Sequence, residues 1–338
     1  MAVILSKKSP SAAEKDLNAI RKGRDLSFFD LVSIDQVTPD DLGLLYDVAR
    51  RFREYKTYKF SFNKGSSQVN AFFEPSTRTS SSFDLAAKQL SMDTAGVSSN
   101  SSVEKGESYL DTVQTIDSYN VKTIVIRSKE SGVPEVAARY TQACIINAGD
   151  GWHEHPTQAL LDGLTILDHF GTKDLKGRTV TVVGDIMHSR VFGSLVRLLK
   201  MLKADIRIAA PLTLIPKDVE KFGVTWYGKV DEALAGADVV YALRVQSERG
   251  ANGFIPTLRE YSKMFGISRK RLDLAKKDAM LMHPGPVIRD IDVHSALAAV
   301  DEQSYILRQV ENGMAVRKAL LWLIADRADG KTKKFTRK

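Results

Sequence analysis

Short apolar runs that alternate with helical patterns are the feature that most constrains the fold of this chain. Residues 69–73, 123–126, 179–185, 205–209 and 238–242 are each apolar enough for a buried strand, and helical spacings of apolar residues follow several of them. Strands and helices in alternation predict mostly parallel sheets flanked by helices, which is an α/β fold. At 338 residues, the chain is long enough for two such domains with separate cores.

The composition is that of a soluble globular protein, with 43% hydrophobic and 27% charged residues. The longest strongly apolar run, at 319–325, is far too short to cross a membrane, and the apolar run at the start is too short for a signal peptide. Cys144 is the only cysteine, which excludes an internal disulfide and a thiolate metal cluster, and its apolar neighbours predict an inert buried thiol. We therefore expect a cytoplasmic protein without a membrane partner.

The net charge of +8 is concentrated in a basic tail. Residues 331–338 contain five basic residues and no acid, so they supply +5 and leave +3 for the rest. No nucleic-acid motif and no basic stripe interleaved with aromatic residues is present, so we expect no nucleic-acid partner. A nucleic-acid binder acting through the tail stays an alternative, and it predicts salt-dependent binding that truncation after Gly330 abolishes.

The stretch from Glu74 to Lys88 predicts an anion site. Residues 69–73 form a strand that Pro75 ends, and apolar residues at helical spacing then predict a helix that begins between 76 and 79. The first turn of a helix offers N–H groups and the positive end of its dipole to a phosphate, and Arg78 adds a planar fork of donors. An ordinary N-cap needs one hydroxyl, whereas Ser76, Thr77 and Thr79 all flank this arginine.

The same stretch, Phe-x-Glu-Pro-Ser-Thr-Arg-Thr followed by Ser-Phe, resembles the carbamoyl phosphate motif of the aspartate and ornithine carbamoyltransferase family. The resemblance implies that Ser76, Thr77, Arg78 and Thr79 bind carbamoyl phosphate, with Arg78 and Thr79 also catalytic. The family commonly has a second arginine where this chain has Ser80, and we expect the role of that arginine to be mainly structural.

Residues 147–162 give a second signal, a strand that runs through a Gly-rich turn into a helix with Pro156 at its first position. His155 and Gln158 lie three residues apart across the helix start, so both side chains can face one ligand. A metal site is disfavoured because a third ligand at suitable spacing is missing. The segment resembles the His-Pro-Thr-Gln motif of the family, which implies that His155 donates to the carbamoyl oxygen and that Gln158 holds the carbamoyl amide.

Further site residues are implied at another strand end and on a loop. Arg127 follows a buried strand, where it could be a surface charge, but the family places a carbamoyl phosphate ligand there. The polar loop at 98–108 is predicted to be mobile and resembles the family segment that reaches the adjacent subunit. This resemblance implies that Ser101 and Lys105 act in a neighbouring site, Lys105 on aspartate, and hence a homotrimer with shared sites.

The second half of the chain predicts a half-Rossmann domain that binds a dicarboxylate. Residues 184–189 lack the G-x-G-x-x-G pattern that dinucleotide binding requires, so NAD is disfavoured. Arg190, Arg244 and Gln246 lie at predicted strand ends, and two guanidinium groups suit two carboxylates. These residues match the aspartate-binding positions of the family, and 248–253 is a candidate lid.

The turn at 283–286 is fixed by two prolines and exposes carbonyl groups that can accept from an amide or an ammonium; the alternative is a rigid connector. It resembles the His-Pro-x-Pro turn of the family, which implies that Gly285 and Pro286 accept from the carbamoyl and amino groups. The arginine that often follows in the family is Val287 here.

The resemblance implies a domain plan of four parts. A carbamoyl phosphate-binding domain spans residues 1–155, with 1–26 loosely ordered, and an aspartate-binding domain spans 156–310. Residues 311–330 form a third part, in which an apolar helix at 312–326 packs back on the first domain. Residues 331–338 form the basic tail.

The implied reaction transfers the carbamoyl group of carbamoyl phosphate to the amine of L-aspartate, in de novo pyrimidine biosynthesis. No cofactor is needed, because the phosphate already activates the donor. Two alternatives stay open: a carbamoyltransferase for another amine such as ornithine, and an inactive homologue that binds partners as a scaffold. The sequence also leaves open whether a regulatory chain or a second pathway enzyme associates.

Overall fold

The computed structural model describes residues 9–98, 107–245, 254, 257–298 and 301–326. The chain divides into two compact units, one formed by Met1–Thr157 with Glu311–Lys338 and the other by Gln158–Val310. The division falls in the first turn of α6 (Pro156–Phe170) and inside α11 (Ile306–Ala325), so each of these two helices contributes residues to both units.

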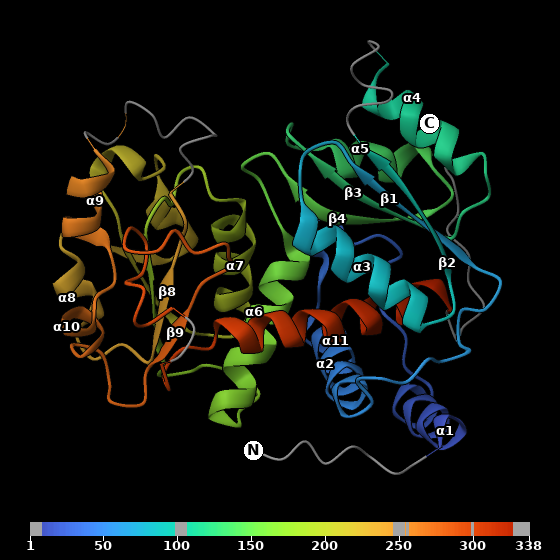
Figure 1. The fold of residues 1–338 in the computed structure, drawn as a ribbon, viewed down its shortest axis with the longest axis horizontal. Coiled ribbons are helices and arrows are strands. Elements are labelled where there is room, and N and C mark those ends of the chain that lie inside the picture. The colour runs from blue at the N-terminus through green and yellow to red at the C-terminus, as the bar shows by residue number, and fades with distance from the viewer. Residues whose placement is uncertain (1–8, 99–106, 246–253, 255–256, 299–300, 327–338) are drawn as a thin grey trace. The chain divides into compact units, whose positions relative to one another are not determined.

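The first unit contains a parallel sheet, as the alternating pattern predicts (Figure 1). Among the described residues, its strand order is β2-β1-β3-β4. The strands are β1 (Ser67–Phe72), β2 (Asp93–Ser98), β3 (Thr123–Ser128) and β4 (Cys144–Asp150), and the helices are α1 (Pro10–Arg21), α2 (Pro39–Glu54), α3 (Thr77–Gln89), α4 (Tyr109–Asp117) and α5 (Val133–Tyr140), with a 3-10 helix at Ile34–Gln36.

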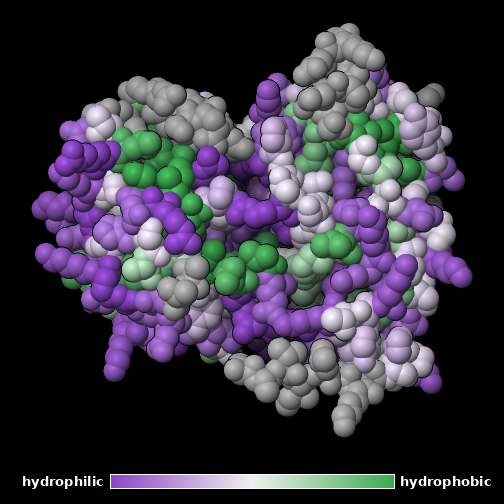
Figure 2. All heavy atoms as spheres, viewed as in Figure 1, coloured by the Kyte–Doolittle hydropathy of each residue, from purple (hydrophilic) through white to green (hydrophobic). Residues whose placement is uncertain are grey.

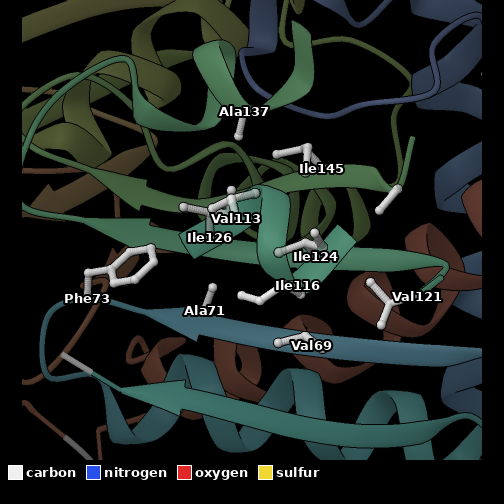
Figure 3. Close-up of a cluster of buried hydrophobic side chains, with 11 residues drawn as sticks. Val69, Ala71, Phe73, Val113, Ile116, Val121, Ile124, Ile126, Ala137 and Ile145 are labelled. Atoms are coloured by element: carbon white, nitrogen blue, oxygen red, sulfur yellow. The ribbon is translucent and has the colours of Figure 1, made fainter. Parts of the chain in front are cut away.

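The core of this unit follows from the period of two along the strands. Val69, Ala71 and Phe73 lie on one face, where they pack with residues of β3 and with Val113 and Ile116 of α4 (Figure 3). Gln68 lies on the other face, and its Nε2 atom donates to the carbonyl of Phe83 in α3 at 3.4 Å. Each Val or Ile buried in this way contributes about 1.5–3 kcal/mol.

The prediction that residues 1–26 are loosely ordered is wrong for α1. Ser9 caps this helix through the N–H of Ala12, and Pro10 occupies a first-turn position, where its missing N–H costs nothing. Ala13 and Leu17 are fully buried, and Arg21 forms an ion pair with Asp25. The prediction relied on the polar composition of the segment and overlooked that Ala13 and Leu17, at i, i+4 spacing, form an apolar stripe.

A further helix of this unit is α2, and the helix predicted at 312–326 is confirmed. Thr38 caps α2 and forms a capping box with Asp41, whose carboxylate also accepts from Ser27. The second helix is α11, which begins at Ile306, six residues before the predicted start. Trp322 of α11 is fully buried and stacks on Phe62, with ring centroids 4.5 Å apart.

The second unit also has a parallel sheet, with the strand order β7-β6-β5-β8-β9 among the described residues. The predicted strands at 179–185, 205–209 and 238–242 are confirmed, whereas β7 was not predicted. The elements are β5 (Thr179–Val183), α7 (Arg190–Met201), β6 (Asp205–Ala209), β7 (Val224–Tyr227), α8 (Val230–Leu234), β8 (Val239–Ala242), α9 (Leu258–Phe265), α10 (Arg269–Leu272) and β9 (Met280–Met282), with 3-10 helices at Leu212–Leu214 and Val219–Phe222.

The molecular face in Figure 2 is mostly hydrophilic, with hydrophobic residues in smaller areas. Within the described ranges, none of the helices combines the length and the apolar character that crossing a membrane requires.

Candidate functional site

The start of α3 differs from the other Ser- or Thr-capped helices of its unit. Ser76 is the N-cap residue of α3, with φ −161° and ψ 85°, and its side chain makes no capping hydrogen bond. By contrast, the N-cap side chains of α1, α2 and α4 each accept from a backbone N–H of the first turn. Without a side-chain cap, the first-turn N–H groups of α3 are available to an anion. Thr77 and Arg78 are exposed at this helix start.

Arg127 is held at the end of β3 by residues from two neighbouring segments. Its Nε atom donates to Glu74 Oε1 at 2.7 Å, and one terminal nitrogen donates to the carbonyl of Ala148 at 3.4 Å. Both side chains of the Glu74–Arg127 pair are mostly buried, at 10% and 13% exposure. Since β1 and β3 are adjacent, with Phe72 opposite Arg127, this arginine lies beside the chain segment that leads into α3.

The turn from β4 into α6 is organised around the buried carboxylate of Asp150. Asn147 donates to Oδ1 at 2.7 Å, and the N–H of Gly132 donates to Oδ2 at 2.7 Å. Burial raises the pKa of Asp150, but hydrogen bonds from His153, Gly132 and Asn147 outweigh it and hold the pKa below its ordinary value. The carboxylate therefore stays ionised and fixes the turn that carries His155.

His155 and Glu154 complete this turn. Glu154 is fully buried, and its carboxylate accepts from the N–H of Ile34 at 3.0 Å. His155 is 4% exposed and directly precedes Pro156, the first residue of α6, as predicted. No group of His, Cys, Asp and Glu suited to holding a metal ion occurs among the described residues.

Gln158 is fixed by a buried cluster in the second unit. Its Nε2 atom donates to Asp162 Oδ1 at 3.0 Å, and Gln309 Nε2 donates to the same oxygen at 2.7 Å. The hydroxyl of Tyr241 donates to Asp162 Oδ2 at 2.7 Å, and burial together with this carboxylate raises the pKa of Tyr241 well above its ordinary value. Because Asp162 takes the amide nitrogen of Gln158, the side-chain oxygen of Gln158 is the end that can serve a ligand.

The cluster continues to the turn at 283–286. Gln309 Oε1 accepts from the N–H of His283 at 3.0 Å, and His283 Nδ1 accepts from the N–H of Gly285 at 2.8 Å. Since Nδ1 is an acceptor, the imidazole proton is on Nε2, which donates to Asp292 Oδ2 at 3.3 Å. One chain of hydrogen bonds therefore joins Gln158 to Gly285, which precedes the exposed Pro286.

Arg190 and Arg244 follow neighbouring strands, β5 and β8. Arg190 is the first residue of α7 and is 3% exposed, while Arg244 is half-buried just after β8. Gly184 has φ +133°, and a Cβ atom there would lie 2.7 Å from the carbonyl of Leu243, so only glycine fits. The two strand ends thus approach closely at the edge where a parallel sheet binds ligands.

Three of the predicted site residues, Ser101, Lys105 and Gln246, lie outside the described residues, as do the candidate lid at 248–253 and most of the loop at 98–108. Within the first unit, the structure brings Arg127 beside the β1–α3 segment. Within the second, it links Gln158 with Gly285 and places Arg190 and Arg244 on adjacent strand ends.

Sequence reasoning missed the residues that support these groups. Glu74 belongs to the Phe-x-Glu-Pro-Ser-Thr-Arg-Thr motif. An acidic residue between a strand and a predicted anion site could therefore have indicated a partner for a nearby cation. Asp162 and Gln309 are 147 residues apart, and no local pattern indicates that they meet.

Two family models match the chain in succession. The first, for the carbamoyl-P binding domain of aspartate/ornithine carbamoyltransferase, matches residues 30–168. The second, for the Asp/Orn binding domain of the same family, matches residues 176–324.

Individual relatives give the same result. The chain is 47% identical to the aspartate carbamoyltransferase catalytic subunit of Desulforamulus reducens, over 87% of this chain and 95% of the relative. It is 49% identical to that of Sorangium cellulosum, over 84% and 87% respectively. Among solved structures, aspartate transcarbamoylase from Trypanosoma cruzi in complex with carbamoyl phosphate and aspartate matches with a TM-score of 0.77 and 31% identity, over 87% of this chain and 96% of that one. The chain therefore belongs to the aspartate/ornithine carbamoyltransferase family.

Proposed function

We propose that the chain transfers the carbamoyl group of carbamoyl phosphate to the amine of L-aspartate, giving N-carbamoyl-L-aspartate and phosphate in de novo pyrimidine biosynthesis. The observation that carries this proposal is the 43–49% identity, over most of the chain, to relatives named aspartate carbamoyltransferase catalytic subunit. The two matched domains, described as binding carbamoyl-P and Asp/Orn, supply one substrate site each.

In this proposal, carbamoyl phosphate is bound by the start of α3 and by Arg127. Ser76, Thr77, Arg78 and Thr79 offer backbone N–H groups, hydroxyls and a guanidinium to the phosphate, and the missing side-chain cap at Ser76 supports this use of the helix start. Glu74 supports the role of Arg127 by holding its Nε atom, so that the guanidinium is oriented before the substrate arrives.

The carbamoyl group is recognised through hydrogen bonds with His155, Gln158 and the turn at Gly285 and Pro286. A carbamoyl group has an oxygen that accepts and an NH₂ that donates. His155 donates to the oxygen, while the side-chain oxygen of Gln158 and the carbonyls of Gly285 and Pro286 accept from the NH₂. The hydrogen bond from Gln158 Nε2 to Asp162 supports this division, because it orients the acceptor end of the amide toward the ligand.

Aspartate is bound through its two carboxylates by Arg190 and Arg244, with Gln246 and Lys105 as further ligands. A guanidinium takes a carboxylate bidentately, so two arginines on neighbouring strand ends suit a diacid. Ornithine carries a second ammonium in place of the side-chain carboxylate and would meet repulsion from the same two cations. The arginine pair therefore favours aspartate over the ornithine alternative.

Catalysis then rests on positioning and on charge. The substrates bring about four negative charges together, and the arginines lower the cost of that approach. As the carbonyl carbon becomes tetrahedral, Arg78, Thr79 and His155 donate to its oxygen; removing one such donor typically costs about 10²–10³ in rate. The amine must attack unprotonated, and the departing phosphate accepts its proton.

We also propose a homotrimer in which Ser101 and Lys105 of one subunit serve the site of the next, with no metal and no organic cofactor. The cytoplasmic location expected from the sequence stays a prediction, as does association with a regulatory chain or a second pathway enzyme.

The test is phosphate release from carbamoyl phosphate, measured with L-aspartate, with L-ornithine and with neither. We expect rapid release with aspartate only. Release with ornithine but not with aspartate would instead identify ornithine as the carbamoyl acceptor. Tight binding of a bisubstrate phosphonate–dicarboxylate without turnover of either amine would identify an inactive scaffold.

A further inference from the structure

A pocket of about 190 Å³ lies in the first unit, where the C-terminal end of α2 and the last residue of α3 meet α11. Its lining includes Phe52, Arg53, Lys56, Gln89, Glu311 and Lys318. None of them belongs to the proposed carbamoyl transfer site.

Lys318 is the unusual member of this lining, because it is a lysine that is only 2% exposed. Its ammonium lies over the ring of Phe52, 5.4 Å from the centroid. Among the described residues, no carboxylate forms an ion pair with it. Burial lowers the pKa of Lys318 to about 8, which reflects the cost of holding this charge without a counter-ion.

The other charges around the pocket do not balance Lys318. The contacts of Arg53 include a hydrogen bond that it donates to Asn312 Oδ1 at 2.8 Å. Glu311 is the single carboxylate among the described residues of the lining, and it is paired with Lys56. With Lys318 protonated, the described residues of the lining carry three cations and one anion, an excess of two positive charges.

Gln89 adds a polar atom with no partner. Its Oε1 atom is buried and accepts no hydrogen bond within the described part of the chain. A buried acceptor of this kind is costly unless a donor reaches it, and a ligand with a hydroxyl, such as monohydrogen phosphate, could supply one.

We propose that this pocket binds a small oxyanion, a phosphate or a carboxylate, with Lys318 as its buried counter-charge. Removing one partner of a buried ion pair leaves an uncompensated charge, so an anion that fills the pocket converts an unfavourable lone ammonium into a paired one. Arg53 strengthens the attraction at the pocket wall. The site is independent of carbamoyl transfer, since it shares no residue with it.

Calorimetric titration tests the proposal. Inorganic phosphate, and separately acetate, is titrated into full-length protein whose transfer site is filled by a stoichiometric bisubstrate phosphonate–dicarboxylate. We expect phosphate or acetate to bind once per chain, and the stronger of the two to define the ligand class. Lys318→Met keeps the length of the side chain and removes its charge, and we expect it to weaken this binding at least about tenfold.

Lys64→Met is the matched control, because Lys64 is an exposed lysine of the same unit outside the pocket, and its binding should match that of the wild type. Equal affinity in the wild type and in Lys318→Met would overturn the proposal, as would the absence of any binding in the wild type.

A second measurement uses the wild type alone, in case Lys318→Met does not fold. Acetic anhydride at pH 8 acetylates neutral amines, and peptide mass spectrometry reports each lysine separately. We expect phosphate or acetate to protect Lys318 several-fold while Lys64 reacts unchanged. Acetylation of Lys318 at the same rate with and without either anion would overturn the proposal.

Discussion

Glu74 Oε1 accepts a hydrogen bond from Arg127 Nε at 2.7 Å, so the segment that leads into α3 orients the arginine at the end of the neighbouring strand. Both side chains are mostly buried, which keeps the charge pair strong. The same glutamate affects Tyr109: burial, then Glu130 and Glu74, raise the pKa of this tyrosine to about 12. Glu74, which lies between β1 and α3, therefore acts on Arg127 and on Tyr109 as a fixed negative charge.

Glu74→Gln should weaken phosphate recognition, because the amide keeps the shape of the side chain and loses the charge that holds Arg127. We expect the KM for carbamoyl phosphate and the inhibition constant of inorganic phosphate to rise together, each by about tenfold. Initial-rate kinetics measure both. Glu135→Gln, which removes the exposed partner of Arg139, is the control and should leave both constants unchanged. A rise in the KM for aspartate alone would contradict the assignment of Arg127.

Asp162→Asn should act on the carbamoyl group and not on the phosphate. The buried carboxylate accepts from Gln158, Gln309 and Tyr241, and an asparagine cannot accept from all three. Gln158 then no longer has one fixed orientation, so we expect the KM for carbamoyl phosphate to rise about tenfold.

The inhibition constant of inorganic phosphate distinguishes positioning from general damage in Asp162→Asn. Phosphate lacks a carbamoyl group, so its binding should stay at the wild-type value. Asp174→Asn, an exposed position beyond α6, is the control. A parallel loss of phosphate binding would show that Asp162 only maintains the fold.

The parts of the site that could be predicted from sequence are those whose cause is local. The β1–α3 junction was predicted because an apolar strand, Pro75 and a run of hydroxyls fall within a dozen residues, and each has a known effect on the backbone. The β4–α6 turn was predicted for the same reason, with Pro156 at the first helical position. In both cases the fold of the segment and its chemistry are set by the same short stretch.

The parts that were missed depend on tertiary contacts. In the sequence, Asp162 is a single polar residue on an apolar helix. Its role depends on contacts with Tyr241 and Gln309, which belong to distant segments of the chain. The helix α1 was missed because its stability comes from burying Leu17, and composition alone does not show that a partner surface exists. Propensity within a segment is a weak guide wherever burial decides the outcome.

The proposed homotrimer with shared sites gives a quantitative prediction for mixed trimers. Lys105→Ala and His155→Ala chains should each be inactive alone, because each lacks a group that the transfer reaction needs. If Lys105 serves the neighbouring subunit, mixing equal amounts after reversible dissociation should recover about a quarter of the wild-type activity per site, the statistical share of sites with both groups intact. Phosphate release measures the recovery. No activity in the mixture would rule out sites shared between subunits.

The buried Lys318 should make the free energy of unfolding depend on pH. Its pKa is about 8 in the folded chain, whereas a lysine in the unfolded chain has its ordinary value of 10.5. Between these two values the unfolded state binds the extra proton, so the free energy of unfolding rises with pH across this window. The gain is at most about 3 to 4 kcal/mol, at roughly 1.4 kcal/mol per pH unit. Below pH 8 both states are protonated, and the full cost of the buried charge is present.

Urea unfolding at pH 7.5, 9 and 10 measures this effect as a difference between the wild type and Lys318→Met. Other groups titrate equally in both proteins, so only the wild type should show the additional rise in the free energy of unfolding with pH. At pH 7.5, Lys318→Met should be the more stable of the two proteins, because it lacks the buried charge. Saturating phosphate should remove most of the difference in slope, because a bound anion favours the charged lysine and moves its pKa back toward the ordinary value. Parallel pH profiles for the two proteins without phosphate would mean that the ammonium of Lys318 is solvated rather than buried.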